Sequence, residues 1–377
     1  MSVDADFRFD PWTAEYQRDL WQIHRTLRDE HPVYHDPERG LYVLSRFADI
    51  WRAVNDVESF SNQVAAAATL APMILYLDPP RQTALRALVS RAFTPKRVAE
   101  LEGFVRATVA ALIGPFEERG EGDAQGGFAS ILPSMVIARL IGLPDDQVEE
   151  FRHLAEAFID SDYTEAVDNM YRLFAALLEA RRREPADDLM SALIEAEIDG
   201  QRLAPDEVLG FCQLLISAGN DTTSSFIGNC LVLLAEHPEQ RRLLIEEPSR
   251  MPEAIEEMMR MDTPTQMLSR VARRDVELHG VVIPAGSEVQ LLWGAANHDE
   301  REFADPDRFD ITRPISRHLA LGHGTHYCLG ASLARLETRV ALEEWLGHFP
   351  DYRLARPPER VVSFWARAHR EIPVELR

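Results

Sequence analysis

A short segment near the C-terminal end of the chain has residue types and a spacing that suit a metal ligand. Residues 321–328 read LGHGTHYC, and a predicted helix follows at once. Gly322 and Gly324 allow a tight turn and a close approach of the backbone to a flat ligand. Cys328 would lie at the N-terminal end of the helix, where unpaired amides and the helix dipole favour a thiolate. The segment therefore predicts a soft metal ligand held by a rigid turn.

Two other interpretations of this segment stay open at this point. Cys328 could be a buried free cysteine in an ordinary loop, which is the usual state of a lone cysteine. Alternatively, His323, His326 and Cys328 could hold zinc, although a structural zinc site usually has more thiolates and a wider spacing between its ligands.

A second candidate lies inside the longest predicted helix, Pro205–His237. Residues 218–223 read AGNDTT, and glycine and threonine are poor residues for a helix interior. Asp221 is costly in an apolar helix unless it has a partner or a function. Such a local conflict often marks a functional site, although a helix–helix contact eased by small residues explains it equally well. By helical spacing, one face carries Leu214, Ser217, Ala218, Asp221, Thr222 and Ser225.

A third candidate is a charged pair on the predicted helix Met251–Met261. Glu257 and Arg260 are three residues apart, so their side chains share one helix face. Taken alone, the pair predicts a surface ion pair that contributes less than ~1 kcal/mol. Residues 305–309, which read DPDRF, follow within an irregular, charge-rich stretch, Asp299–Ala320.

These candidates need a scaffold that is mostly helical. Apolar residues recur at spacings of three and four in further predicted helices, which are Ala14–Glu30, Phe47–Asn55, Pro95–Glu118, Ile131–Ile141, Gln147–Ile159, Asn169–Arg183 and Leu329–Leu346. Asp78, followed by two prolines, predicts a helix start, and that helix reaches about Phe93. Alternating patterns predict short strands at Leu41–Ser45, Val276–Ile283, Val289–Leu292, Tyr352–Leu354 and Val361–Trp365.

Length and composition narrow the classes of function. The chain has 377 residues, 46% of them hydrophobic, and no repeat or long linker divides it, so we expect one domain over residues 1–377. The net charge of −22 argues against a nucleic-acid partner. Three scattered cysteines fit a reducing cytoplasm. The N-terminus shows no secretory signal, and the longest nearly apolar run, Val64–Leu77, is shorter than the roughly 20 residues of a membrane span, so we expect a cytoplasmic protein without a membrane partner.

Taken together, these motifs resemble those of the cytochrome P450 family, here its soluble bacterial haem-thiolate monooxygenases. Residues 321–330 resemble the haem-binding loop, with Leu321 in the position of the usual aromatic residue. Residues 218–223 resemble the oxygen-activation motif, and residues 305–309 the Pro-x-Arg-Phe segment. The charged pair described above resembles the Glu-x-x-Arg motif. Four separately spaced motifs in the family's order are far more specific than one match.

The resemblance implies a mainly α fold with a small β part, in which a long central helix lies over a buried haem b (iron protoporphyrin IX). Cys328 would be the axial ligand of the haem iron. The other residues that would contact the haem or its carboxylates are Gln82, Arg86, Arg270, Leu321, Gly322, Gly324 and His326. Gln82 stands where many members carry a histidine, so it offers a hydrogen bond without a charge.

The resemblance also implies roles around the oxygen and the substrate. Ala218 and Gly219 would leave room for dioxygen, and Asp221 and Thr222 would deliver protons. By family position, the substrate pocket would include Met73, Leu75, Leu214, Ser217, Thr265, Gln266 and Phe364.

Two further expectations concern charged residues. The family buries its Glu-x-x-Arg pair together with a later arginine, which implies that Glu257, Arg260 and Arg308 form one buried network. Arginines near the cysteine loop would face an acidic ferredoxin, and these are Arg313, Arg317, Arg335 and Arg339.

The implied reaction is hydroxylation or epoxidation of a small to medium lipophilic substrate with dioxygen (O2). Since the chain carries no flavin or nicotinamide motif, electrons from NAD(P)H would arrive through a ferredoxin reductase and a ferredoxin. Two alternatives stay open: other chemistry on the same cofactor, such as peroxide-driven oxidation or C–C coupling, and a non-catalytic haem- or ligand-binding protein. Asp221 and Thr222 favour the oxygen-dependent reaction, because peroxide users do not need a proton relay.

Overall fold

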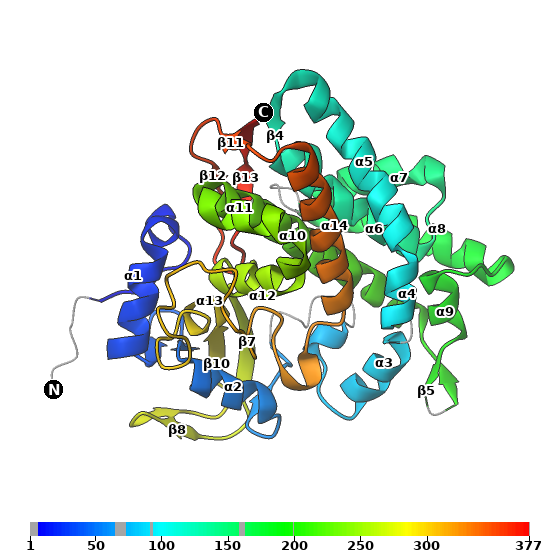
Figure 1. Cartoon of the computed structure of the whole chain (residues 1–377). Helices are drawn as coiled ribbons and strands as arrows, with labels where there is room; N and C mark the ends of the chain where they lie inside the picture. The colour runs from blue at the N-terminus through cyan, green and yellow to red at the C-terminus, as the bar shows by residue number, and fades with distance from the viewer. Residues whose placement is uncertain (1–6, 65–72, 91–92, 158–162, 199, 377) are drawn as a thin grey trace.

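Helices form most of the computed structural model (Figure 1), which describes residues 7–64, 73–90, 93–157, 163–198 and 200–376. The helices are α1 (Ala14–Glu30), α2 (Phe47–Asn55), α3 (Arg81–Val89), α4 (Pro95–Glu100), α5 (Glu102–Arg119), α6 (Ile131–Ile141), α7 (Val148–Ala157), α8 (Tyr163–Arg183), α9 (Leu189–Glu195), α10 (Pro205–Glu236), α11 (Pro238–Glu246), α12 (Met251–Met261), α13 (Trp293–Ala296) and α14 (Ala331–His348). The predicted bounds of α1, α2, α6 and α12 are confirmed residue for residue.

The strands form small sheets. The largest has the order β1-β2-β10-β7-β3, in which β2 and β10 are parallel and the other pairs antiparallel. Its strands are β1 (Val33–Asp36), β2 (Leu41–Leu44), β3 (Phe60–Ser61), β7 (Met267–Ala272) and β10 (Glu288–Leu292). A three-stranded sheet joins β4 (Glu121–Asp123), β14 (Pro373–Glu375) and β11 (Arg353–Leu354). Three two-stranded pairs are β5 (Glu197–Ile198) with β6 (Gln201–Arg202), β8 (Val276–Leu278) with β9 (Val281–Ile283), and β12 (Glu359–Arg360) with β13 (His369–Glu371).

The longest helix, α10, runs through the middle of the molecule (Figure 1). Its 32 residues span about 48 Å at 1.5 Å per residue. Pro205 occupies the first turn, and the Glu207 carboxylate accepts a hydrogen bond from the Ala204 N–H at 2.9 Å, so the helix start is well capped. α10 packs against α6, α8, α12 and α14. Because α10 lies in the middle of the molecule, the residues that it carries can contact elements on either side of it.

The main hydrophobic core lies on the helical side, among α5, α6, α10 and α14. Trp345 on α14 is fully buried, and its ring meets Phe116 at 5.3 Å and Tyr352 at 5.8 Å, both edge to face. Two smaller clusters lie around the five-stranded sheet, where α2 and α1 cover it. The predicted fold class, mainly α with a small β part, is confirmed, and the prediction of a single domain stays a prediction.

Some element predictions differ from the structure. The predicted helix Pro95–Glu118 is two helices, because Leu101 donates to the carbonyl oxygen of Val98 in a tighter turn. The strand predicted at Val361–Trp365 is wrong: β12 ends at Arg360, where the pairing with β13 shifts register. Most of the apolar run that ends at Leu77 lies outside the described residues. None of the described helices combines the length and the apolar character needed to span a membrane.

The charged pair on α12 is buried. Glu257 and Arg260 have fully buried side chains, and Arg260 donates from Nε to Oε2 at 2.7 Å and from Nη2 to Oε1 at 2.9 Å. Arg260 Nη1 donates at 2.8 Å to the carbonyl oxygens of Asn297 and Pro306. Two charges removed from water need such complete hydrogen bonding. The pair therefore fastens α12 to the segment that leads to Cys328.

The third member of this network is Arg313, and the prediction of Arg308 in that role is wrong. The Arg313 side chain is 13% exposed, and its Nε donates to Glu257 Oε1 at 3.2 Å. The Arg308 side chain is 67% exposed and pairs with Asp310 at 3.4 Å. The carbonyl oxygen of Arg308 accepts from Arg313 Nη2 at 2.9 Å. Arg308 thus contributes its backbone carbonyl oxygen to the network, while its guanidinium group is exposed to water.

Replacing Arg313 by alanine should lower the free energy of unfolding by about 3 kcal/mol, because Glu257 loses a buried cationic partner. The matched change Arg308→Ala should alter it by less than ~0.5 kcal/mol, because that side chain is solvated. Urea unfolding followed by circular dichroism measures both variants. Equal effects of the two changes would contradict the assignment of Arg313.

Candidate functional site

The loop before Cys328 is a tight turn built on two glycines. Gly322 and Gly324 have φ of +65° and +70°, in the left-handed region that favours glycine. The Cys328 N–H donates to the carbonyl oxygen of Leu321 at 2.9 Å and closes the loop. α14 begins at Ala331, so the predicted place of Cys328, just before a helix N-terminus, is confirmed.

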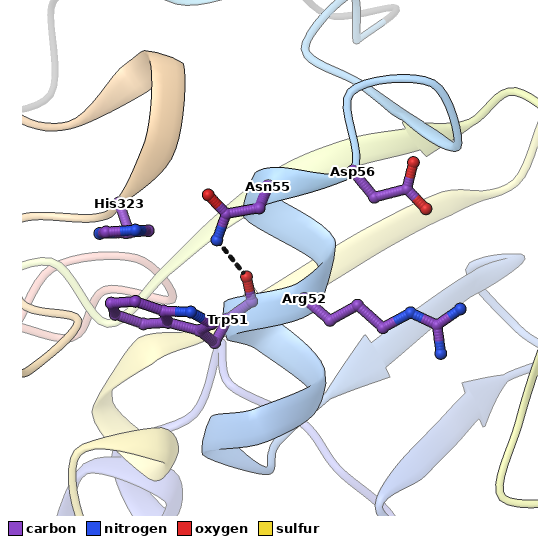
Figure 2. Close-up of a pocket in the computed structure, with 5 residues that line it drawn as sticks. All are labelled: Trp51, Arg52, Asn55, Asp56 and His323. Atoms are coloured by element: carbon purple, nitrogen blue, oxygen red, sulfur yellow. Dashed lines mark hydrogen bonds between the residues drawn. The ribbon is translucent and has the colours of Figure 1, made fainter.

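Helix α2 holds this loop from one side. A Cβ atom at Gly324 would lie 2.8 Å from the carbonyl oxygen of Val54, so only glycine allows this approach. The loop continues as a short 3-10 turn, η6 (Gly324–His326), which packs on α2. The ring of His323 stacks on that of Trp51, with centroids 3.7 Å apart (Figure 2). Glycine at position 324 therefore allows the loop to pack closely against α2.

A shallow surface pocket of about 520 Å³ adjoins this contact, lined by Trp51, Arg52, Asn55, Asp56 and His323 (Figure 2). Cys328 is not among its lining residues. Within the part of the chain that the structure describes, no group of three His, Cys, Asp or Glu side chains could hold a metal ion. The stacking of His323 and this finding give the zinc interpretation no support.

The Cys328 thiol has cationic neighbours. Burial raises the pKa of this thiol, while the Gly330 N–H and the guanidinium groups of Arg86 and Arg335 lower it. Cys212, by contrast, has a pKa raised to about 12 by burial alone. A thiol beside an amide and two cations is better suited to carry negative charge than an ordinary buried cysteine.

Two arginines beside the loop, and a histidine within it, have unsatisfied charge or hydrogen-bonding capacity. Burial lowers the pKa of Arg270 to about 10, and burial together with Arg270 lowers that of His326 to about 4. His326 Nε2 is buried without a hydrogen-bond partner. Among the described residues, neither Arg86 nor Arg270 forms an ion pair, since Asp78, which attracts Arg270, is already bonded to Arg273. Anionic groups from a ligand would complete this arrangement.

Gln82 positions the loop. It lies on α3 with 1% of its surface exposed, and its Nε2 donates to the carbonyl oxygen of Thr325 at 2.8 Å. Its Oε1 accepts from the Thr83 hydroxyl at 3.3 Å. Because the amide is engaged within the protein, we revise its predicted contact with a haem carboxylate to one that holds the cysteine loop against α3.

These features fit a haem. A haem presents iron to a thiolate and carries two carboxylates, which guanidinium groups bind well. Cys328 would hold the iron, and Arg86, Arg270 and the unpartnered Nε2 of His326 would hold the carboxylates. Leu321 packs half-buried against the helical core at the start of the loop.

On α10, the predicted oxygen-activation residues have side chains that bond to the helix backbone. Thr222 Oγ1 donates to the Ala218 carbonyl oxygen at 2.5 Å, and Ser225 Oγ to that of Asp221 at 2.6 Å. Ala218 is exposed, although α10 is buried along most of its length. A Cβ at Gly219 would lie 3.1 Å from a side chain of α6, so this glycine lets the two helices approach. The accessible face of α10 is therefore the one that carries Ala218.

Asp221 is a partly buried acid with one polar neighbour. Burial raises its pKa to about 7, and the Asn220 Nδ2, which donates to Asp221 Oδ1 at 3.1 Å, lowers it only in part. Among the described residues, no cation forms an ion pair with this carboxyl. It is therefore partly protonated at neutral pH and can give or take a proton. Asn220 was not among the predicted site residues, although a second polar side chain in a largely buried helix was the signal for it.

Five of the predicted pocket residues have apolar or hydroxyl-bearing side chains, which range from buried to partly exposed. Leu214 and Ser217 lie on α10 before Ala218, and Ser217 Oγ donates to the Gln213 carbonyl oxygen at 3.2 Å. Met73 is buried, and Leu75 and Thr265 are partly exposed.

The other two predicted pocket residues make their contacts elsewhere. Gln266 is fully buried, and its Nε2 donates to the carbonyl oxygen of Thr263 at 2.6 Å. Phe364 stacks on Trp12, with ring centroids 5.2 Å apart. Gln266 Oε1 is nevertheless buried without a partner, and the assignment of Gln266 and Phe364 to the pocket stays a prediction.

The four arginines expected to face a ferredoxin are all engaged in ion pairs. Arg313 is largely buried against Glu257, so it is wrong as a docking residue. The others pair with acids of the same chain: Arg317 with Glu302 at 2.7 Å, Arg335 with Glu256 at 2.6 Å, and Arg339 with Glu102 at 2.7 Å. An acidic partner protein would therefore meet arginines whose positive charge is already partly neutralised by acids of this chain.

Comparisons with known proteins agree with the motifs. The family model described as cytochrome P450 matches residues 145–351. Cytochrome P450 130 of Mycobacterium tuberculosis is 38% identical over 370 residues, which cover 91% of each chain. The vitamin D(3) 25-hydroxylase of Pseudonocardia autotrophica is 36% identical over 369 residues, which cover 91% of this chain and 92% of that protein. Among solved structures, cytochrome P450 CYP109Q5 from Chondromyces apiculatus has a TM-score of 0.93 and 35% identity, and the match covers 98% of each chain.

The change Gly324→Ala should destabilise the protein by about 2 kcal/mol, because alanine is strained at φ +70° and its Cβ would meet the Val54 carbonyl oxygen. Gly347→Ala on α14, where a Cβ would meet nothing within 4 Å, should leave stability unchanged or raise it slightly. Thermal unfolding compares the two. A Gly324→Ala protein as stable as the parent would show that the loop can move away from α2 without cost.

Proposed function

Since the chain belongs to the cytochrome P450 family, we propose that this haem monooxygenase uses O2 and two externally supplied electrons to hydroxylate or epoxidise a small to medium lipophilic substrate. The observation that carries the proposal is the Cys328 thiol, which follows a glycine turn clamped on α2 and has cationic neighbours. The name of the vitamin D(3) 25-hydroxylase relative supports hydroxylation of a lipophilic compound.

The cysteine loop and the surrounding cations would hold the cofactor. When bound, the haem supplies oxygen activation, which thiolate ligation favours. Cys328 would bind the iron as a thiolate. Burial raises the pKa of its thiol, and the Gly330 N–H and Arg86 offset part of that rise. Arg270 and His326 would bind carboxylate oxygens, and this compensates the otherwise unpaired burial of the Arg270 guanidinium.

The polar residues of α10 would move protons. Asp221 would hold a proton on its carboxyl and pass it through water toward Thr222 Oγ1. Thr222 Oγ1 donates to the Ala218 carbonyl oxygen, so its lone pairs are free to accept from that water. Asn220 would keep the Asp221 carboxyl in place through its hydrogen bond. The small side chain of Ala218 would leave space on the same face.

The substrate would bind against mostly apolar side chains. Met73, Leu75 and Leu214 would exclude water, and the hydroxyl groups of Ser217 and Thr265 would orient a polar group of the substrate. Electrons from NAD(P)H would pass through a ferredoxin reductase and a ferredoxin that docks near Cys328.

The haem-loaded protein provides the test of this function. A panel of terpenoids, steroids, macrolides and aromatic compounds is screened by the low-to-high-spin shift of the Soret band, and hits are assayed for product. We expect oxygen-dependent product with NADH, ferredoxin and reductase. Product with peroxide alone would favour the peroxide-driven alternative, and steady reduction without product from any ligand would favour a binding protein.

The change Cys328→Ser should abolish the red-shifted Soret band of the reduced, carbon monoxide-bound protein, because the thiolate ligand is lost. The control is Cys230→Ser, which alters a buried cysteine near the C-terminal end of α10 and should keep the band. Absorption spectra of both variants decide the matter. Persistence of the band in Cys328→Ser would show that another residue binds the iron.

The pH dependence of turnover should report Asp221. Its pKa of about 7 means that the protonated form is lost as pH rises through neutrality, so product formation should fall above about pH 7. Asp221→Asn should lower the rate about 100-fold and remove this limb of the profile. Asp206→Asn, an exposed position on the first turn of α10, is the control and should keep the parent profile. An unchanged pH limb in Asp221→Asn would assign it to another group.

A further inference from the structure

The C-terminal hairpin brings three basic side chains to one buried face. β12 and β13 pair antiparallel, with Arg360 opposite His369. Cross-strand partners point to the same face of a sheet. Arg367 precedes His369 by two residues in extended chain, so its side chain points to that face as well. Within this hairpin (Figure 1), β13 packs on α10.

One carboxylate, that of Asp262 after α12, is bonded to both arginines. Arg360 Nη2 donates to Asp262 Oδ2 at 2.9 Å, and Arg367 Nε donates to Oδ1. Burial would raise the pKa of Asp262, but Arg360 and Arg367 hold it well below its usual range. Glu236 attracts Arg360 more weakly and, among the described residues, forms no ion pair with it. Two guanidinium groups thus face one ionised carboxylate, which leaves one positive charge in surplus.

Three polar atoms of this cluster lack partners. Arg367 Nη1 and both ring nitrogens of His369 are buried without a hydrogen bond. Arg367 is 8% exposed and His369 4%. Burial and the nearby Arg360 lower the pKa of His369 to about 3, so its ring is neutral and offers one N–H. Buried donors without acceptors are rare in folded proteins.

None of the described residues forms a hydrogen bond with these three atoms. On α10, Asn229 Oδ1 accepts from Arg360 Nη1 at 3.0 Å, and its Nδ2 donates to the carbonyl oxygens of Asp262 and Arg367. On α1, the ring of Trp21 lies 4.9 Å from the guanidinium carbon of Arg367. His24, also on α1 and close enough to Arg367 for its charge to be felt, bonds to the Tyr16 hydroxyl at 2.8 Å, and its Nδ1 is likewise buried without a partner.

We propose that this cluster binds one small monovalent anion of the size of chloride, held by Arg367 Nη1 and the N–H of His369. A single negative charge balances the surplus guanidinium. The donor atoms are closed to solvent, which favours a small anion over a bulky one such as a phosphate ester. The site is separate from the residues proposed for haem and oxygen chemistry.

The anion would fasten the C-terminal segment to the connection between α12 and β7. In that segment the Arg367 N–H donates to the carbonyl oxygen of Pro264 at 2.8 Å, and Trp365 accepts from the Gln266 N–H at 2.7 Å. Thr265, one of the proposed pocket residues, forms an isolated bridge with Ala366. Anion binding at Arg367 would therefore order the backbone that carries Thr265.

Crystals of the haem-loaded protein grown in sodium bromide test the site directly. We expect an anomalous peak within hydrogen-bonding distance of both Arg367 and His369, because bromide replaces chloride in such sites and scatters anomalously. Water density or no density at this place would overturn the proposal.

A solution measurement tests whether the anion stabilises the fold. Replacing sodium gluconate by sodium chloride at equal ionic strength should raise the thermal unfolding midpoint by about 2 °C. His369→Leu should abolish the rise, and His369→Gln, which retains an N–H donor, should keep it. Arg370→Met on the same strand, where the guanidinium lies 3.7 Å from the exposed Glu359, is the control and should also keep it.

The bromide crystals and the thermal unfolding measurements together decide whether the anion site exists. An equal rise in the parent and in His369→Leu would place chloride elsewhere and overturn the proposal. A bromide peak without any rise in the parent would indicate an adventitious ion only, and would overturn it too. If His369→Leu does not fold, the bromide peak and the parent's chloride response decide the question.

Discussion

The position of Cys328 depends on a buried ion pair that lies on a different helix. Arg260, bonded to Glu257, donates to the carbonyl oxygen of Asn297 at 2.8 Å. The side chain of Asn297 then accepts from the Leu319 N–H at 2.7 Å, just before the glycine turn. This chain of hydrogen bonds connects α12 to the cysteine loop. Because both charges are removed from water, any displacement of the loop would leave a buried polar group without a partner.

The molecule has an acidic composition but places arginines where anionic ligands would bind. The chain carries a net charge of −22, yet several of its wholly or partly buried arginines lack a full complement of partners. Arg86 and Arg270 lie beside the cysteine loop, and Arg367 belongs to the C-terminal hairpin. Acidic side chains dominate the surface, where water solvates them. Buried guanidinium groups keep their charge and therefore require negative partners, either from the protein or from ligands.

Helix α10 shows how a local conflict in a sequence can carry function. Its residues 218–223 contain small and hydroxyl-bearing side chains that weaken a helix interior, and a carboxyl that burial pushes toward neutrality. The helix tolerates them because it is anchored along its other faces by α6, α8, α12 and α14. The stability that packing provides over most of its length allows one turn to deviate from the best helix chemistry.

The sequence by itself determined the helices with regular apolar periods and strong ends, and the turn that places Cys328 before α14, because these features depend on neighbours along the chain. It could not determine which guanidinium reaches a buried carboxylate. Arg313, and not Arg308, meets Glu257, since the turn between them directs one side chain inward and the other into water. The tertiary structure likewise decided that Gln82 holds the loop. Such contacts follow from the path of the backbone between elements distant in sequence, and residue spacing does not encode that path.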